Sequence, residues 1–315
     1  MATAEQLKSL IRTHFRQDAE GFTTVALQLA AHEARQGHKA VAKEIRDLVD
    51  ANRKSENLQL APAKKSLAEL VYAPQTRARL SDMVLNSSQK KRLERILKEY
   101  RNQDKIKAYG LNPRRKVLLT GKPGTGKTMT ASVLAGELHM PLFIVQMDRL
   151  VSKYMGETSA KLRLLFDGIC EHRAIYLFDE FDTLGASRGR ENEVGEMRRV
   201  LNTFLQFIEQ DASDSLIVAA TNNQHILDQA LYRRFDDLIH YTLPEEDMFC
   251  QLVENRLERF LPNSLDWKSL WQHAKGLSHA EISQACVDAV KEAILEEWKA
   301  ISTDALIGAL KDRKL

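Results

Sequence analysis

Glycine, lysine and hydroxyl residues are concentrated in the segment GKPGTGKT at 121–128. It follows a β-branched apolar run and precedes a stretch of helical period that begins near Lys127, so it fits G-x-x-x-x-G-K-[ST] in a strand–loop–helix context. Glycines let several backbone N–H groups point at one anion, Lys127 adds a positive charge for β- and γ-phosphates, and the Thr128 hydroxyl suits Mg²⁺. The predicted nucleotide-binding residues of this loop are Pro123, Gly124, Thr125, Gly126, Lys127, Thr128 and Met129.

Two neighbouring carboxylates, Asp179 and Glu180, follow the apolar run AIYLF at 174–178. An acid at the carboxyl end of a strand beside a phosphate loop can complete the coordination of Mg²⁺, so Asp179 and Thr128 are the predicted metal ligands. Glu180 is then placed to polarise a water molecule for attack on the γ-phosphate. The combination predicts hydrolysis of a nucleoside triphosphate.

These residues require a scaffold of alternating strands and helices. Short apolar or β-branched runs alternate with helix-length segments between 116 and 244, which favours an α/β fold with a parallel five-stranded sheet and helices on both faces. The predicted strands are KVLLT, PLFIVQ, AIYLF, LIVAAT and LIHYTL. Residues 245–315 are helical by period throughout, and Ser278 with Glu281 has the pattern of a capping box.

The first part of the chain has a different organisation. Apolar residues recur at helical spacing in three segments of residues 1–54, punctuated by Gly21 and Gly37, which predicts a small three-helix bundle. A polar stretch then breaks the period. The predicted domains are a helical adaptor at 1–57, a linker at 58–84, a nucleotide-binding domain at 85–244 and a helical lid at 245–315.

Composition narrows the functional class. Among 315 residues, 46 basic and 43 acidic side chains give a net charge of +3, which argues against a protein that coats nucleic acid. Fifteen basic and five acidic residues lie between 64 and 116. They could form an electrostatic patch for nucleic acid or an acidic partner, although a solvated helix face is the favoured interpretation. Three cysteines lack metal-ligand spacing, and no segment has the pattern of a membrane span or signal peptide. A cytoplasmic protein without membrane contact is expected.

Several ordered motifs between about Leu67 and the C-terminus resemble the AAA+ ATPases. They are GKPGTGKT, SKYMGETSAKLRLLF, LFDEFDTLGASRG, AATNN, LDQALYRRFDD and GLSHAEISQAC. The order and spacing are similar to the branch that contains katanin, spastin and the ESCRT-disassembling ATPase. The resemblance implies a P-loop NTPase αβα domain with a helical lid, and ATP and Mg²⁺ as cofactors.

The resemblance also implies roles for single residues. Asn222 resembles the polar sensor that orients the attacking water near Glu180. Arg233 and Arg234 resemble arginine fingers, which in this family reach the nucleotide of the neighbouring subunit; a salt-bridged surface pair is the alternative. Ala280 stands in the second sensor region, where this sequence has no arginine, as in the katanin branch. Arginine fingers imply a homo-oligomeric ring, with a hexamer as the expected assembly.

Lys153, Tyr154 and Met155 correspond in the resemblance to a first pore loop that grips a polypeptide. Residues 187–191 would be a second pore loop, or simply a solvated connection. The implied function is ATP hydrolysis by a ring that remodels, unfolds or threads a protein client, with a separate protease or effector protein as a further partner. The alternatives are a nucleic-acid-associated loader of the same superfamily and a scaffold whose assembly depends on nucleotide.

Overall fold

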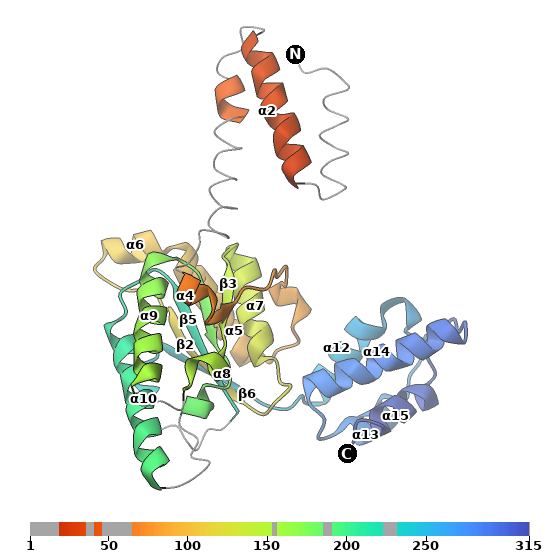
Figure 1. The fold of residues 1–315 in the computed structure, drawn as a ribbon. Coiled ribbons are helices and arrows are strands. Elements are labelled where there is room, and N and C mark those ends of the chain that lie inside the picture. Colours follow the sequence, from red (N-terminus) through yellow and green to blue (C-terminus); the bar gives the residue numbers. More distant parts are fainter. Residues whose placement is uncertain are drawn as a thin grey trace. The chain divides into compact units, whose positions relative to one another are not determined.

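The computed structural model describes residues 19–35, 41–45, 65–152, 156–184, 191–222 and 232–314 (Figure 1). The chain divides into two compact units, Met1–Ala63 and Lys64–Leu315. In the first, α2 spans Ala19–Arg35 and a shorter helical stretch spans 41–45. Helix α2 confirms the second of the three helices predicted for residues 1–54. The first of them lies outside the described residues, so the bundle stays a prediction.

The second unit is built around one sheet with the strand order β1-β3-β4-β5-β2-β6. All pairings from β3 to β6 are parallel, with registers such as Leu118 opposite Ala219 and Leu177 opposite Val218. Each of the five runs predicted as strands is therefore a strand. The bounds are β1 Val71–Tyr72, β2 Lys116–Gly121, β3 Leu142–Val145, β4 Ile175–Phe178, β5 Leu216–Thr221 and β6 Asp237–Tyr241.

The sheet has six strands where the sequence predicted five, and the additional one is the edge strand β1. Val71 and Tyr72 of β1 pair antiparallel with Val145 and Ile144 of β3, which makes a sheet of six strands. Two residues are too short a run to leave an alternating pattern in the sequence, because a periodic signal needs about four or more. The parallel character of the other five strands is unaffected.

Residues 65–84 fall within the predicted linker, but they are ordered against the α/β part. They carry α4 (Lys65–Ala68), β1 and η1 (Leu80–Asp82). Along α7 this segment comes so close that a Cβ on Gly136 would lie 2.0 Å from the carbonyl oxygen of Ala78. The Arg79 guanidinium donates to the Gly136 carbonyl oxygen at 3.0 Å. The segment is thus packed against α7, and its last residues line the cavity described below.

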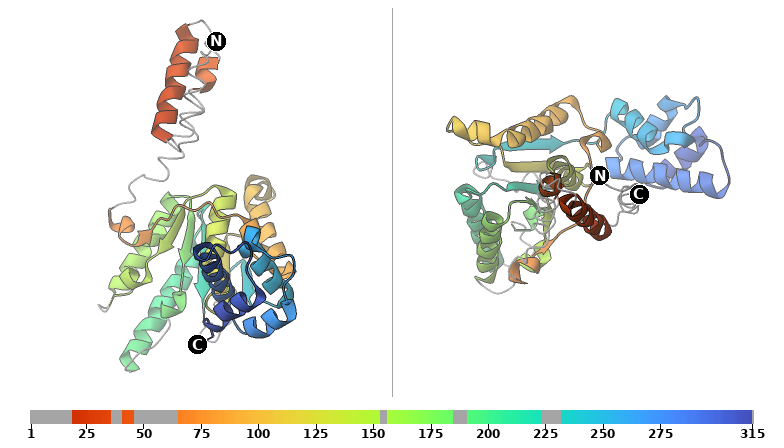
Figure 2. Two further views of the ribbon diagram at one scale, coloured as in Figure 1. Left: turned by 90° about the vertical axis from the view of Figure 1, so that its right-hand side faces the viewer. Right: turned by 90° about the horizontal axis from the view of Figure 1, so that it is seen from above.

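Helices cover both faces of the sheet. Leu93 and Ile96 of α5 and Leu134 of α7 pack with one face, in one buried cluster with β2, β4 and β5. An aromatic cluster of Phe166, Phe178, Phe204 and Phe207 joins α9 and α10 to the other face. Figure 2, seen from above, shows the strands between these two layers. The helices are α5 Ser87–Arg101, α6 Gln103–Ala108, α7 Lys127–Leu138, α8 Met147–Leu150, α9 Glu157–Glu171, η2 Phe181–Leu184 and α10 Glu191–Gln210.

The C-terminal part of this unit is all helical, as predicted, and has its own core. Phe249 is fully buried and packs against Trp267 and Trp271. Ser278 and Glu281 form the predicted capping box at the start of α14. The elements are α12 Glu246–Leu257, η4 Glu258–Phe260, α13 Trp267–Ala274, α14 His279–Leu295 and α15 Thr303–Lys311. None of the helices that the structure describes is both long and apolar enough to cross a membrane.

Candidate nucleotide-binding and hydrolysis site

The glycine-rich loop connects the end of β2 to the start of α7, where the sequence predicted it. Gly124 and Gly126 have φ values of +71° and +105°, which is the left-handed region that glycine enters without steric cost. A Cβ on Gly124 would also lie 2.5 Å from the Ser278 hydroxyl oxygen of the lid. The loop therefore needs glycine both for its curl and for its close approach to α14.

Lys127 is the buried cation of the loop. The residue is only 6% exposed, and its Nζ donates to the carbonyl oxygens of Gly121 and Lys122 at 2.8 Å each. Burial lowers the pKa of the Lys127 ammonium, and the nearby carboxylates, Asp179 first among them, oppose that shift. The ammonium is thus held against the loop and beside an acidic group.

The two predicted metal ligands meet. The Thr128 hydroxyl, at the start of α7, donates to Oδ2 of Asp179, at the end of β4, over 2.5 Å. A hydroxyl and a carboxylate are the oxygen ligands that Mg²⁺ takes from a protein when phosphates and waters supply the rest. Elsewhere in the described part of the chain, no group of three or more His, Cys, Asp or Glu side chains is placed to hold a metal. The residues present therefore fit a magnesium ion at this pair.

Glu180 has an unusual backbone. Its φ of +50° is rare for a residue with a side chain, and its N–H donates to Oδ1 of Asp179 at 3.0 Å. This turn directly follows β4, whose four residues are all buried. Asn222 directly follows β5, the neighbour of both β4 and β2. The carboxyl ends of three adjacent strands thereby bring the loop, the two carboxylates and Asn222 to one edge of the sheet.

A cavity of about 420 Å³ lies at this edge, between the sheet and the lid. Its volume is within the range of small-molecule sites. The backbone N–H of Ala280 in α14 donates to the Gly124 carbonyl oxygen at 2.9 Å, which ties the lid to the loop. The lining residues are Asp82, Met83, Val84, Pro123, Gly124, Thr125, Gly126, Lys127, Thr128, Met129, Asp179, Glu180, Asn222, Leu252, Arg256, His279, Ala280 and Ser283. Every nucleotide-binding and metal-ligating residue predicted from the sequence is among them.

Several lining residues were not predicted. Met83 and Val84 belong to the segment interpreted as a linker, and Leu252 and Arg256 lie one turn apart on α12. They reach the cavity only through tertiary packing, so no local pattern marks them. The i, i+4 spacing of Leu252 and Arg256 is the single signal that could have suggested a shared face. His279 opens α14 directly before Ala280.

The two predicted arginine fingers differ in their surroundings. Nε of Arg234 pairs with the Glu209 carboxylate of α10 at 3.0 Å. Arg233 is exposed and has no ion pair with another described residue. Neither arginine is among the described residues that line the cavity of its own chain. Of the two arginines, Arg233 is therefore the one without an ion pair to another described residue.

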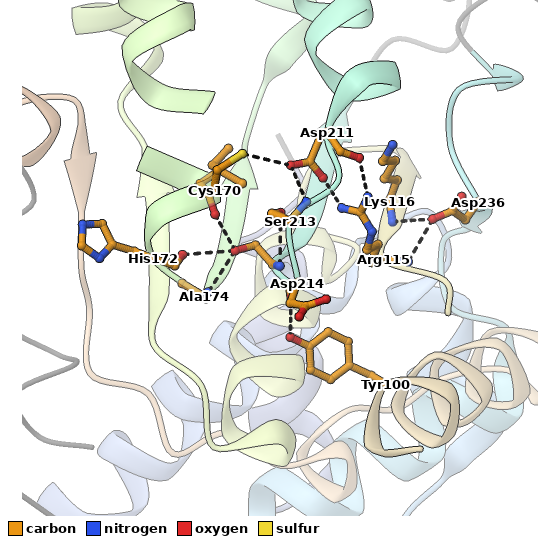
Figure 3. Close-up of polar contacts among 12 residues, drawn as sticks. Tyr100, Arg115, Lys116, Cys170, His172, Ala174, Asp211, Ser213, Asp214 and Asp236 are labelled. Carbon is orange, nitrogen blue, oxygen red and sulfur yellow. Dashed lines mark hydrogen bonds and ion pairs between the residues drawn. The ribbon is translucent and has the colours of Figure 1, made fainter. Parts of the chain in front are cut away.

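A polar network fixes the segment that follows these arginines (Figure 3). Oδ2 of Asp236 accepts the backbone N–H groups of Arg115 and Lys116 at 2.9 Å each, at the start of β2. The Arg115 guanidinium pairs with the Asp211 carboxylate, whose side chain is fully buried. Burial, with the Asp211 charge beside it, raises the pKa of the Cys170 thiol. This network lies at the opposite strand ends from the cavity, so its role is to hold the sheet and residues 232–236.

The predicted pore-loop residues Lys153, Tyr154 and Met155 lie outside the described residues, as do 185–190. The flanks of the first loop are described. The Ser152 hydroxyl donates to the Glu157 carboxylate, and the Ser152 N–H donates to the Thr158 hydroxyl oxygen at 3.0 Å. Both ends of the segment 153–155 are thus fastened to the start of α9.

Comparison with known proteins gives the family. The sequence profile described as "ATPase family associated with various cellular activities (AAA)" matches residues 117–243. An uncharacterised AAA family ATPase of Sinorhizobium fredii, y4kL, is 34% identical over 99% of this chain and 96% of its own length. The chain belongs to the AAA family of ATPases. The six-stranded, mostly parallel sheet with the glycine-rich loop at its carboxyl edge agrees with that assignment.

Two further relatives of this AAA ATPase carry more specific names. A proteasome-activating nucleotidase of Methanococcus maripaludis is 33% identical over 65% of this chain and 52% of its own length. An ATP-dependent zinc metalloprotease FtsH of Parabacteroides distasonis is 31% identical over 71% of this chain and 35% of its own length. The AAA ATPase thus spans about half of the nucleotidase and about a third of the metalloprotease.

Proposed function

We propose that this AAA ATPase hydrolyses ATP with Mg²⁺ in a homo-oligomeric ring, and uses the cycle to remodel or thread a protein client. The observation that carries the proposal is the cavity in which Lys127, the Thr128–Asp179 pair and Glu180 converge beneath a lid tied to the loop by Ala280. A lid bonded to the phosphate loop changes its position when the loop's ligand changes. That coupling is what converts hydrolysis into motion.

Each residue of the cavity has a task in this scheme. The loop amides and the Lys127 ammonium bind the phosphates, and Thr128 and Asp179 would hold Mg²⁺, which supplies charge neutralisation at the β- and γ-phosphates. Glu180 accepts a proton from the attacking water, and Asn222 orients that water. Glu180 has a left-handed backbone and lines the cavity, while Asp179 bonds to Thr128.

Arg233 is the finger that we assign to the neighbouring subunit. A guanidinium aimed at the γ-phosphate stabilises charge that develops in the transition state. The Glu209 ion pair of Arg234 and the Asp236 contacts with β2 support this assignment, because they fix the backbone directly after Arg233, which makes no ion pair with another described residue. Arg234 then acts in its own chain as the anchor of the segment. Since the finger serves another chain, the working unit is a closed ring, with a hexamer as the proposed assembly.

The client in this proposal is a polypeptide held by Tyr154 and Met155, between the fastened flanks Ser152 and Glu157. An aromatic and a thioether side chain grip extended chain through apolar contact without sequence preference. Relatives named proteasome-activating nucleotidase and metalloprotease make a separate protease the partner to look for. The katanin and spastin branch stays a prediction, based on the ordered motifs of the sequence and on the second sensor region without an arginine.

The nucleic-acid alternative has less support. Six of the fifteen basic residues between 64 and 116 make ion pairs within the chain, which offset part of the positive charge. The pairs are Arg92–Asp237, Arg95–Glu99, Arg101–Glu137, Lys107–Asp214, Arg114–Glu99 and Arg115–Asp211. Cations already paired with carboxylates release few counterions from a nucleic acid backbone.

Two substitutions test the proposal together. Glu180→Gln should lower kcat by about 10²-fold or more while ATP binding persists, because only the base is removed. Tyr154→Ala should abolish unfolding of a tagged model client and leave ATP hydrolysis within about threefold of wild type, since the proposal gives Tyr154 a role in gripping the client and none in hydrolysis. Client capture by Glu180→Gln in ATP completes the test. Wild-type turnover in Glu180→Gln, or wild-type unfolding by Tyr154→Ala, would contradict the proposal.

A further inference from the structure

His279 lines the cavity, and its imidazole makes no hydrogen bond to another described residue. It is the first residue of α14, but the cap of that helix is made by Ser278 and Glu281. Its Nδ1 is buried and has no hydrogen-bond partner among the described residues. Because a buried donor without an acceptor costs about 1–3 kcal/mol, the surroundings of Nδ1 decide which ring nitrogen carries the hydrogen.

The state of the imidazole follows from its surroundings. A hydrogen on Nδ1 would be buried without an acceptor, so the neutral ring carries its hydrogen on Nε2. Burial also lowers the pKa of His279 to about 4, so the ring is neutral at physiological pH. Nε2 makes no hydrogen bond to another described residue and is not enclosed as Nδ1 is. The side chain is therefore a neutral N–H donor in the wall of the cavity.

The position of His279 selects the part of the nucleotide that it meets. The phosphate end of the cavity is defined by Lys127, Thr128 and Asp179. The lining of the same cavity also includes two apolar residues from other parts of the chain, Met83 and Leu252, which suits a planar base. The Ala280 bond to the Gly124 carbonyl fixes the adjacent residue to the loop, so the distance from His279 to the phosphate site is set by the backbone.

We propose that His279 donates a hydrogen bond from Nε2 to a ring nitrogen of the bound purine, and so contributes to the choice of base. This inference rests on the proposed function, because it needs the cavity to bind a nucleotide. A base without an acceptor at this point would cover the Nε2 donor and leave it unpaired, and that penalty is how such a residue discriminates.

Binding to the full-length protein, measured by calorimetry with ATP and with inorganic triphosphate, tests the inference. His279→Ala should weaken ATP binding about fivefold to tenfold, the range of one neutral hydrogen bond, and leave triphosphate binding unchanged. His279→Gln, which keeps a donor, should recover most of the loss. The matched control is His273→Ala, since His273 lies in the same lid and bonds to the Ser269 carbonyl at 2.9 Å. ATP analogues with carbon in place of N1, N3 or N7 then identify the acceptor, as the one analogue that wild type binds as weakly as the variant binds ATP.

Three results would overturn the inference. They are unchanged ATP affinity in His279→Ala, an equal loss for ATP and triphosphate, and wild-type binding of all three analogues at the affinity of ATP. Failure of the proposed function looks different, since the wild-type protein would then bind neither ATP nor triphosphate more tightly than Lys127→Ala does.

Discussion

At the scale of single residues, the site combines a strained backbone with unusual side-chain environments. Glu180 has a left-handed backbone directly after a buried strand, a conformation that costs on the order of 1 kcal/mol and persists where surrounding structure enforces it. The two adjacent carboxylates have different surroundings, since Asp179 bonds to Thr128 while Glu180 lines the cavity without that bond. One residue can then serve the metal and the other the water.

Protonation of His279 should make the free energy of unfolding depend on pH. Its pKa is lowered to about 4 in the folded protein by burial, against 6.5 for the unconstrained group. The unfolded chain therefore binds more protons between these values, so the free energy of unfolding falls as pH drops from 6.5 to 4. We expect His279→Gln to remove about 2 kcal/mol of that fall, after a discount for partial exposure. Urea unfolding at pH 7.0 and 4.5 measures it, and parallel curves for the two proteins would contradict it.

Residues next to strong local signals could be predicted from the sequence, and the others could not. Lys127 and Thr128 begin a helix, and Asp179 ends an apolar strand, so pattern and position agree for each of them. Met83 and His279 reach the same cavity from segments remote in the sequence, and only the packing of the lid and of residues 65–84 brings them there. Tertiary contacts of this kind leave no periodicity to detect.

At the scale of elements, the parallel sheet is held at both ends. The loop and the two carboxylates lie at the carboxyl ends of β2 and β4, and the Arg115–Asp211–Asp236 network lies at the start of β2 (Figure 3). Longer runs such as β2 and β5 were predictable because burial on both faces makes them continuously apolar. The short β1 was not, because its pairing with β3 depends on a partner and not on its own pattern.

Breaking the buried pair should destabilise the whole α/β part. Asp211→Ala removes a fully buried carboxylate and leaves the Arg115 guanidinium, 13% exposed in its side chain, without its partner. We expect a loss of about 3 kcal/mol in the free energy of unfolding. The control is Asp214→Ala, whose pair with Lys107 is 49% and 39% exposed and should contribute less than about 1 kcal/mol. Equal losses in urea unfolding of the two variants would be incompatible with the network as an anchor.

At the scale of the whole molecule, two units share one chain. The unit Lys64–Leu315 contains the sheet, the lid and every described residue of the cavity, and the unit Met1–Ala63 contains α2. The domain boundary predicted at 57/58 lies close to the division at 63/64, but the predicted adaptor role of the first unit stays a prediction.

Removal of the first unit should leave ATP binding intact and test whether that unit is needed for client unfolding. A protein that starts at Lys64 should bind ATP within about twofold of the full chain, since compact units keep their own cores and sites. Client unfolding should fall if the first unit recruits the client. Calorimetric ATP titration and a client-unfolding assay on the same preparation measure both, and loss of ATP binding would show that the site needs residues 1–63.

The central claim is that ATP in the cavity of one subunit is hydrolysed with Arg233 of another. Mixing Arg233→Ala, which has an intact cavity, with Glu180→Gln, which has an intact finger, tests it most directly. Each variant alone should be nearly inactive, and random mixed rings should regain about a quarter of wild-type turnover, because about a quarter of their interfaces combine both intact halves. A mixture that stays as inactive as its components would contradict the account.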